Sequence, residues 1–186
     1  MEKIIYKIKN SKLVKWQIGV IVFSLIVGTL LHFTYEWSGE NKFIASFSAV
    51  NESVWEHLKL VFYPMLIAGI IEYFFVKKIA NNYIEAKTIG IFTAISFIVV
   101  AFFTYTGIIG ASLIVVDILL FVIAIILGEY VAYKLMRRKN ESNNKTKILA
   151  GIILIFLLLC FILCTYFTPE VNLFRDTTTG AYGIYK

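Results

Sequence analysis

The sequence has few charged residues, few cysteines and few histidines. Only 16% of its 186 residues are charged, against 59% hydrophobic, and the mean hydropathy of +0.79 is far from that of soluble proteins. The two cysteines, Cys160 and Cys164, lie four positions apart inside one apolar run, which argues against a disulfide scaffold. The net charge of +6 comes from basic residues that flank apolar runs, so no nucleic-acid partner is predicted.

Apolar runs of bilayer-spanning length recur along the chain, and each is bounded by Lys, Arg, Trp or Tyr. In the first run, Trp16 and Trp37 would lie about 31 Å apart along a helix, which matches the hydrocarbon thickness of a bilayer. The pattern predicts an all-α fold, a single membrane domain over residues 1–186 with the lipid bilayer as its main partner. Its five helices are expected at about 15–37, 53–76, 86–105, 111–135 and 147–166.

The connecting segments are read in the same way. Lysines precede the first run, but no small-residue cleavage site follows it, so a retained first helix is expected rather than a signal peptide. Segment 38–52 is expected along the outer membrane surface, and residues 169–186 form a polar outer tail. Ser53 and Glu56 fit a capping box at the start of the second helix, inside which Pro64 predicts a kink.

The orientation of the helices is predicted from the basic residues. Fourteen of the 18 Lys and Arg residues flank the helices on one side, and only Lys42, Lys59, Arg175 and Lys186 lie on the other. Cytoplasmic loops carry the excess of Lys and Arg in membrane proteins. The N-terminus is therefore predicted inside the cell and the C-terminus outside.

Ionisable residues near the outer ends of the helices are the candidates for function, because charges inside a bilayer cost about 2.5 to 3.5 kcal/mol each. His32 and Glu36 share a helix face, and Glu52, Glu56 and His57 gather at the start of the second helix. A sixth residue, Asp117, is expected about two turns below the outer end of the fourth helix. Three chain segments could thus meet in one outer pocket.

Imidazole and carboxylate ligands suit a divalent metal such as zinc, whose bound water is a nucleophile near neutral pH. The leading hypothesis takes His32, Glu36 and His57 as metal ligands and Asp117 as a further ligand or orienting group. Either Glu52 or Glu56 would be a general base in the hydrolysis of an amphiphilic substrate, or a further ligand. No HExxH motif is present, and each of these residues also has a structural interpretation at the polar membrane interface.

Three further residues, Asn51, Glu72 and Glu129, are interpreted as structural. Lys77, Lys78 and Lys134 are expected to stabilise the two acids at the inner surface. Two other functions stay open: a proton- or cation-coupled carrier that uses His32 and Asp117, and a partner-binding protein without catalysis. A carrier with so few helices would need a homodimer, for which the small residues Ala86, Gly90 and Ala94 offer a face.

Three longer motifs carry a resemblance. They are HFTYEWSG at residues 32–39, NESVWEHLK at 51–59 and TGAYGI at 179–184. The chain resembles a family of small bacterial multi-pass membrane proteins of unknown function. The resemblance implies a location in the bacterial cytoplasmic membrane and draws attention to the three outer segments, but it implies no activity.

Overall fold

The computed structural model describes residues 2–138 and 142–184, and this part of the chain is almost entirely helical. Five of its helices are long and apolar enough to cross a membrane, which confirms the predicted all-α fold with five such helices. A four-residue helix and one turn of 3-10 helix complete the described structure. In chain order the elements are α1 (Glu2–Trp37), α2 (Lys42–Ala45), α3 (Val54–Val76), α4 (Tyr83–Ile109), α5 (Ile114–Met136), α6 (Asn144–Tyr166) and η1 (Asn172–Phe174).

Two helices are longer than predicted. α1 begins at Glu2, well before the predicted residue 15, because the lysine-rich segment ahead of the run contains no Pro or Gly and lysine is a good helix former. α4 continues to Ile109 and ends at Gly110, whose φ of 82° suits a glycine at a helix C-terminus. Hydropathy therefore located the helices but not all of their ends.

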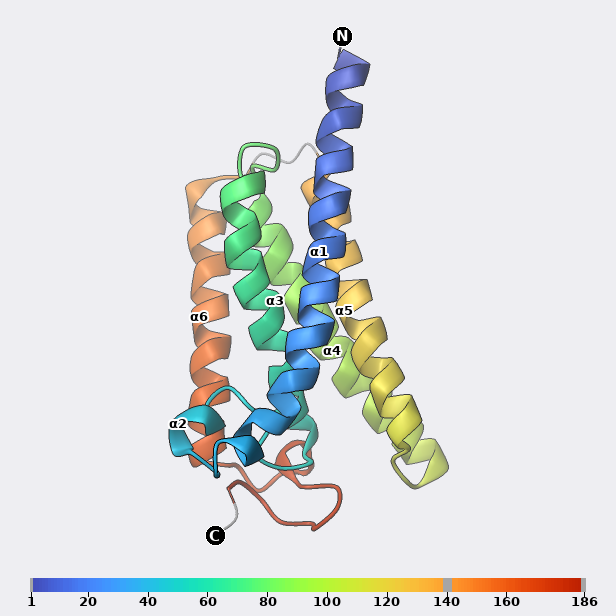
Figure 1. Ribbon diagram of the computed structural model, residues 1–186, viewed down its shortest axis with the longest axis vertical. Coiled ribbons are helices and arrows are strands. Elements are labelled where there is room, and N and C mark those ends of the chain that lie inside the picture. The colour runs from blue at the N-terminus through green and yellow to red at the C-terminus, as the bar shows by residue number, and fades with distance from the viewer. Residues whose placement is uncertain (1, 139–141, 185–186) are drawn as a thin grey trace.

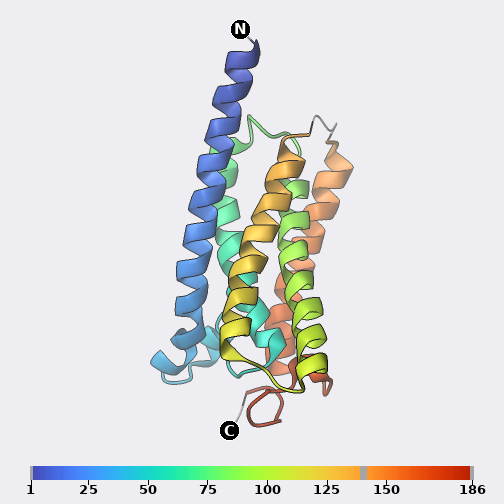
Figure 2. The ribbon, with the colours of Figure 1, turned by 90° about the vertical axis from the view of Figure 1, so that its right-hand side faces the viewer.

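The five long helices run roughly side by side, and the two chain termini lie at opposite ends of the bundle (Figures 1 and 2). One end carries α2, the α4–α5 turn and the C-terminal segment 167–184. The other carries the α3–α4 turn at 77–82 and the connection from α5 to α6. We name these the tail end and the basic end.

α4 and α5 form an antiparallel hairpin with very close backbones. A Cβ atom on Gly90 would lie 2.6 Å from the carbonyl oxygen of Gly128, and one on Gly128 would lie 2.6 Å from that of Gly90. Ala94, on the same face of α4, is fully buried. The predicted dimer face is thus covered by α5 of the same chain, because small residues let these two helices approach.

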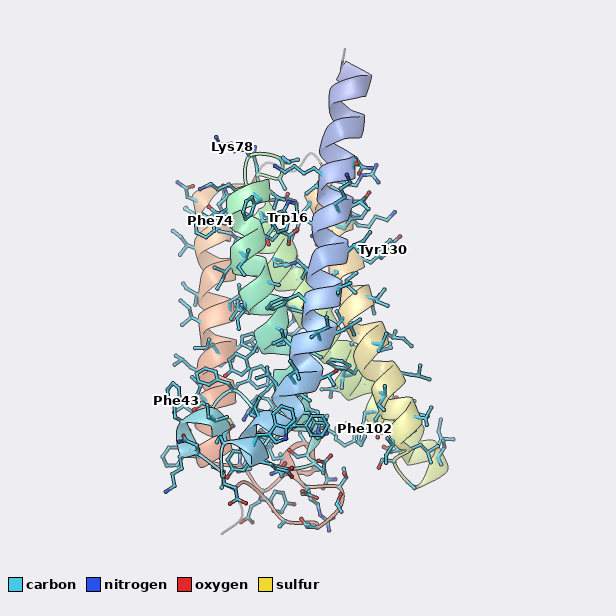
Figure 3. The ribbon with its side chains drawn as sticks, in the orientation of Figure 1. Trp16, Phe43, Phe74, Lys78, Phe102 and Tyr130 are labelled. Carbon is cyan, nitrogen blue, oxygen red and sulfur yellow. The ribbon has the colours of Figure 1, made fainter. Side chains whose placement is uncertain are left out.

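The side chains that point outward are largely apolar, as they are in proteins surrounded by lipid. Phe43 and Tyr130 are among the exposed aromatic residues, and both point away from the bundle in Figure 3. Polar and charged side chains are instead found at the two ends and in a few buried clusters. One cluster at the tail end contains both histidines of the chain.

Candidate metal centre

His32, Glu52 and His57 come together at the tail end. Each offers one ligand atom, and the three atoms lie within 4.8 Å of one another. The Glu52 carboxylate lies between the two rings: its Oε2 is 3.4 Å from His57 Nε2 and its Oε1 is 4.0 Å from His32 Nε2. The three side chains are one third to one half exposed, so the group is open to solvent.

The backbone of α3 orients the His57 ring. His57 Nδ1 lies 2.8 Å from the Ser53 carbonyl oxygen, which can only accept, so Nδ1 carries a proton and donates it. In the neutral ring Nε2 is then the unprotonated nitrogen, and it faces Glu52. A histidine held in this way presents a lone pair to a metal ion.

His32 reaches the same point from the last turns of α1. Its ring packs edge-on against that of His57, with 5.1 Å between the ring centroids, and it stacks on Phe33. Phe33 in turn stacks on the exposed Trp37. The imidazole therefore stands at the edge of an aromatic surface that faces the surroundings of the protein.

The C-terminal segment holds Glu52 in place. The Glu52 backbone N–H donates to Asp176 Oδ2 at 3.0 Å, and the Thr177 hydroxyl donates to the Glu52 carbonyl oxygen at 3.0 Å. Next to it, Asn51 Nδ2 donates to the Gly183 carbonyl oxygen at 2.9 Å. Residues near the C-terminus thus fix the loop before α3.

Asp176 is the centre of this tail. It is only 3% exposed, and its Oδ1 accepts the backbone N–H groups of Thr178 and Thr179, each at 2.7 Å. Its own N–H donates to the Ala181 carbonyl oxygen. The tail is therefore an ordered turn that binds the Glu52 backbone N–H through one buried carboxylate.

The charges around Glu52 favour its ionised form. When His57 is protonated, its Nε2–H donates to the Glu52 carboxylate, and this hydrogen bond is the main reason that the Glu52 pKa lies below its ordinary value; attraction from His57 and His32 adds to it. Burial of the carboxylate and the nearby Asp176 act in the opposite direction. A protonated His57 therefore holds Glu52 as a carboxylate, and a metal ion at His57 Nε2 would take the place of that proton.

The spacing of the group suits a small divalent ion. Tetrahedral zinc with ligands at about 2.1 Å separates neighbouring ligand atoms by about 3.4 Å. The His57 Nε2 to Glu52 Oε2 distance is 3.4 Å already. His32 Nε2 is 4.0 Å from the other Glu52 oxygen, and with all three ligand atoms within 4.8 Å of one another His32 must move closer by about 1 Å. Three protein ligands with solvent access leave one position for water, as in catalytic zinc sites.

Two predicted ligands do not join the group. Glu36 is exposed on α1 and lies outside the set of ligand atoms that converge. Asp117 accepts a hydrogen bond from the Tyr105 hydroxyl, which itself accepts the Leu113 backbone N–H. These contacts hold Asp117 at the α4–α5 turn, which Figure 1 shows well to one side of the other tail-end segments. The structure thus does not bring Glu36 and Asp117 together with the converging ligand atoms of His32, Glu52 and His57.

Glu56 is not available as a general base. It is 3% exposed, and its Oε2 lies 2.6 Å from Lys59 Nζ. The remaining donors to its carboxylate are the Val50 backbone N–H and the Thr165 hydroxyl. The capping box is only half formed, because Ser53 accepts the Glu56 N–H while the Ser53 N–H donates to Asn51 Oδ1.

Lys59 was placed among the outer basic residues, but it is fully buried. Besides Glu56, its ammonium donates to the carbonyl oxygens of Ala45 and Ser48, at 2.9 and 3.2 Å. It therefore ties segment 45–48 to α3. The sequence offers one indication of this ion pair: Lys59 lies in an apolar run, one helical turn after the acid Glu56.

Glu72 and Glu129 do not pair with basic residues at the membrane surface. Both are fully buried, and both contact Lys87 Nζ, at 2.9 and 2.6 Å. The predicted partners of these acids, Lys77, Lys78 and Lys134, are thus replaced by one lysine from α4. Lys87 was counted among the flanking residues, and nothing in its local sequence distinguishes it from them.

Together these features define a helical protein of the multi-pass membrane type with a His–Glu–His cluster at one end. Its sequence matches a family of unknown function (DUF6512) over residues 5–184, and the chain belongs to that family. No curated protein and no solved structure matches it.

Proposed function

We propose that this protein binds a divalent metal ion such as zinc through His32, Glu52 and His57, on the outer face of the bacterial cytoplasmic membrane. The observation that carries the proposal is the convergence of three ligand atoms within 4.8 Å, one from the end of α1 and two from the start of α3 and the loop before it. The excess of Lys and Arg at the basic end supports an outer location for the tail end.

The proposed reaction is hydrolysis of an amphiphilic ester at the headgroup level. A metal ion lowers the pKa of its bound water to about 7, so a hydroxide would be present at neutral pH. The hydroxide would attack the ester carbonyl carbon and the ester C–O bond would break. One water is consumed, and the products are a carboxylic acid and an alcohol. Phe33 and Trp37, stacked beside His32, offer an apolar surface for the chain of such a substrate.

Metal binding tests the proposal directly. The purified protein in lipid nanodiscs is expected to bind one zinc ion per chain, measured by titration calorimetry and by elemental analysis. His32→Ala and Glu52→Gln should each abolish this binding. The matched control is Glu36→Gln, four residues from His32 on the same helix but outside the cluster, and it should bind zinc normally. Equal binding by all four proteins would overturn the proposal.

Hydrolysis requires its own assay. A fluorogenic ester with a long acyl chain, presented in the nanodisc, should be cleaved by the zinc-loaded protein and not after treatment with a chelator. Zinc binding without any cleavage would leave a metal-binding membrane protein and remove the enzyme. Loss of thermal stability in His32→Ala with no zinc bound by the wild type would favour a purely structural cluster.

A further inference from the structure

The second group of buried charges lies near the basic end, far from the histidines. Glu72 on α3, Lys87 on α4 and Glu129 on α5 come from three different helices and meet at one ammonium group. Glu72 and Glu129 are 0% exposed, and Lys87 is 3% exposed. The other described side chains that hydrogen-bond to the group are Gln17 from α1 and Tyr83 from α4, both uncharged at neutral pH.

The charges in this group do not balance. Two carboxylates and one ammonium would leave one negative charge in a site without water contact, at a high cost in solvation. The buried pair of Glu56 and Lys59 makes a useful contrast, because there one acid meets one lysine. The group of Glu72, Lys87 and Glu129 becomes neutral only if it takes up one positive charge.

The hydrogen bonds show where that charge would reside. Glu72 has three donors within reach, and such donors favour the ionised form. They are Gln17 Nε2, Lys87 Nζ and the Tyr83 hydroxyl, whose one proton is shared with the Gly69 carbonyl oxygen at 2.7 Å. Glu129 accepts from Lys87 through Oε2, whereas its Oε1 has no hydrogen-bond partner among the described residues. Glu129 is thus the carboxylate whose charge is less well compensated.

We propose that Glu129, Glu72 and Lys87 form a proton-binding site inside the bundle, in which one proton is held on Glu129 in the resting state. Loss of this proton leaves an uncompensated negative charge in the interior of the helix bundle. Binding and release of the proton are therefore linked to the packing of α3, α4 and α5, which is the property that a proton-coupled membrane protein requires.

A route for the proton leads to the basic end. A cavity of about 70 Å³ lies there, and Tyr73, Lys77, Asn81, Tyr83 and Lys147 are among the residues that line it. Tyr83 connects the cavity with the buried carboxylates, because its hydroxyl also lies 2.9 Å from Glu72 Oε2 and can donate to it. The hydroxyl can relay a proton between water in the cavity and the buried carboxylates.

Infrared spectroscopy of the protein in lipid at neutral pH tests the proposal. A protonated carboxylic acid has a carbonyl band separate from that of carboxylates. Subtracting variant spectra from that of the wild type should show one such band per chain lost in Glu129→Gln. The band should also be lost in Glu72→Gln, because Glu129 then pairs alone with Lys87 and ionises. Glu85→Gln, at the polar start of α4, is the control and should retain it.

Further measurements guard against misfolded variants. Glu129→Gln mimics the neutral acid and should melt at the temperature of the wild type. The band should be the same in sodium and in choline buffers, and its shift in heavy water should be slower in Tyr83→Phe. A wild type without this band, a band that sodium removes, or a band unchanged in Glu129→Gln would overturn the proposal. An unchanged exchange rate in Tyr83→Phe would overturn the route.

Discussion

Replacing Lys59 by methionine is expected to be among the most damaging substitutions in the tail end. The ammonium of Lys59 is fully buried and has three acceptors: the Glu56 carboxylate and the carbonyl oxygens of Ala45 and Ser48. Methionine fills a similar volume, so the change removes the charge and its hydrogen bonds while it largely preserves the packing.

The magnitude follows from what is left behind. Removing one partner of a buried ion pair costs about 3 to 5 kcal/mol, because the other charge remains buried without compensation. The double variant Glu56→Gln with Lys59→Met removes that charge and keeps an acceptor for Val50 and Thr165. Its loss should fall to about 1 to 3 kcal/mol, the cost of unsatisfied carbonyl groups.

The free energy of unfolding can be measured by denaturant titration in lipid–detergent micelles, followed by tryptophan fluorescence. Lys42→Met, in the exposed part of α2, is the control and should change stability by less than about 0.5 kcal/mol. If Lys59→Met is as stable as the wild type, or if the double variant is no more stable than the single one, the buried ion pair does not hold this end of the protein together.

Three other predictions concern the tail, acid and helix packing. Asp176→Ala should weaken zinc binding about 10- to 100-fold through Glu52, as loss of a supporting group does, whereas unchanged calorimetric affinity would contradict the role of the tail. The lowered pKa of Glu52 contributes stability above its unfolded pKa of about 4.3, and this is lost as the pH falls through the lower folded value. The melting temperatures of the metal-free wild type and Glu52→Gln should therefore converge as the pH falls. Because Glu52 is half exposed, the stability difference that is lost should be less than about 1 kcal/mol, and a difference that stays constant with pH would refute this. Gly90→Ala should lower the free energy of unfolding by about 1 to 3 kcal/mol, because the new Cβ clashes with Gly128. Gly151→Ala, where a Cβ would have no atom within 4 Å, is the control and should not destabilise the protein. Equal stabilities of the two variants would show that α4 and α5 can move apart at Gly90 without loss of stability.

Local patterns were sufficient for the helices because each helix depends on its own segment. A bilayer requires every spanning segment to satisfy its backbone internally and to carry enough apolar residues, and both requirements are readable within some twenty positions. The ends of α1 and α4 were less well predicted. At α1 the lysine-rich segment continues the helix ahead of the apolar run, and at α4 the helix continues past Gly107 to Ile109, so the predicted ends were too early or too late.

The candidate site was predicted only in part. The sequence singled out His32 and His57 as ligands and Glu52 as a general base, and it grouped Glu36 and Asp117 with them on spacing and depth alone. Spacing places residues on a face of one helix, whereas their meeting depends on how helices are rotated against each other. Tyr105 and the α4–α5 turn hold Asp117 elsewhere, and no pattern within α5 shows this.

The sequence by itself determined that the chain has five helices able to span a membrane and which few ionisable residues they carry. The tertiary structure decided the partners of those residues. Lys87 resembles a flanking lysine, yet the close contact of Gly90 with Gly128 brings α4 and α5 together and places its ammonium between Glu72 and Glu129. Hydropathy is a sum over neighbours in sequence, whereas the partner of a buried charge is set by contacts between helices that are distant along the chain.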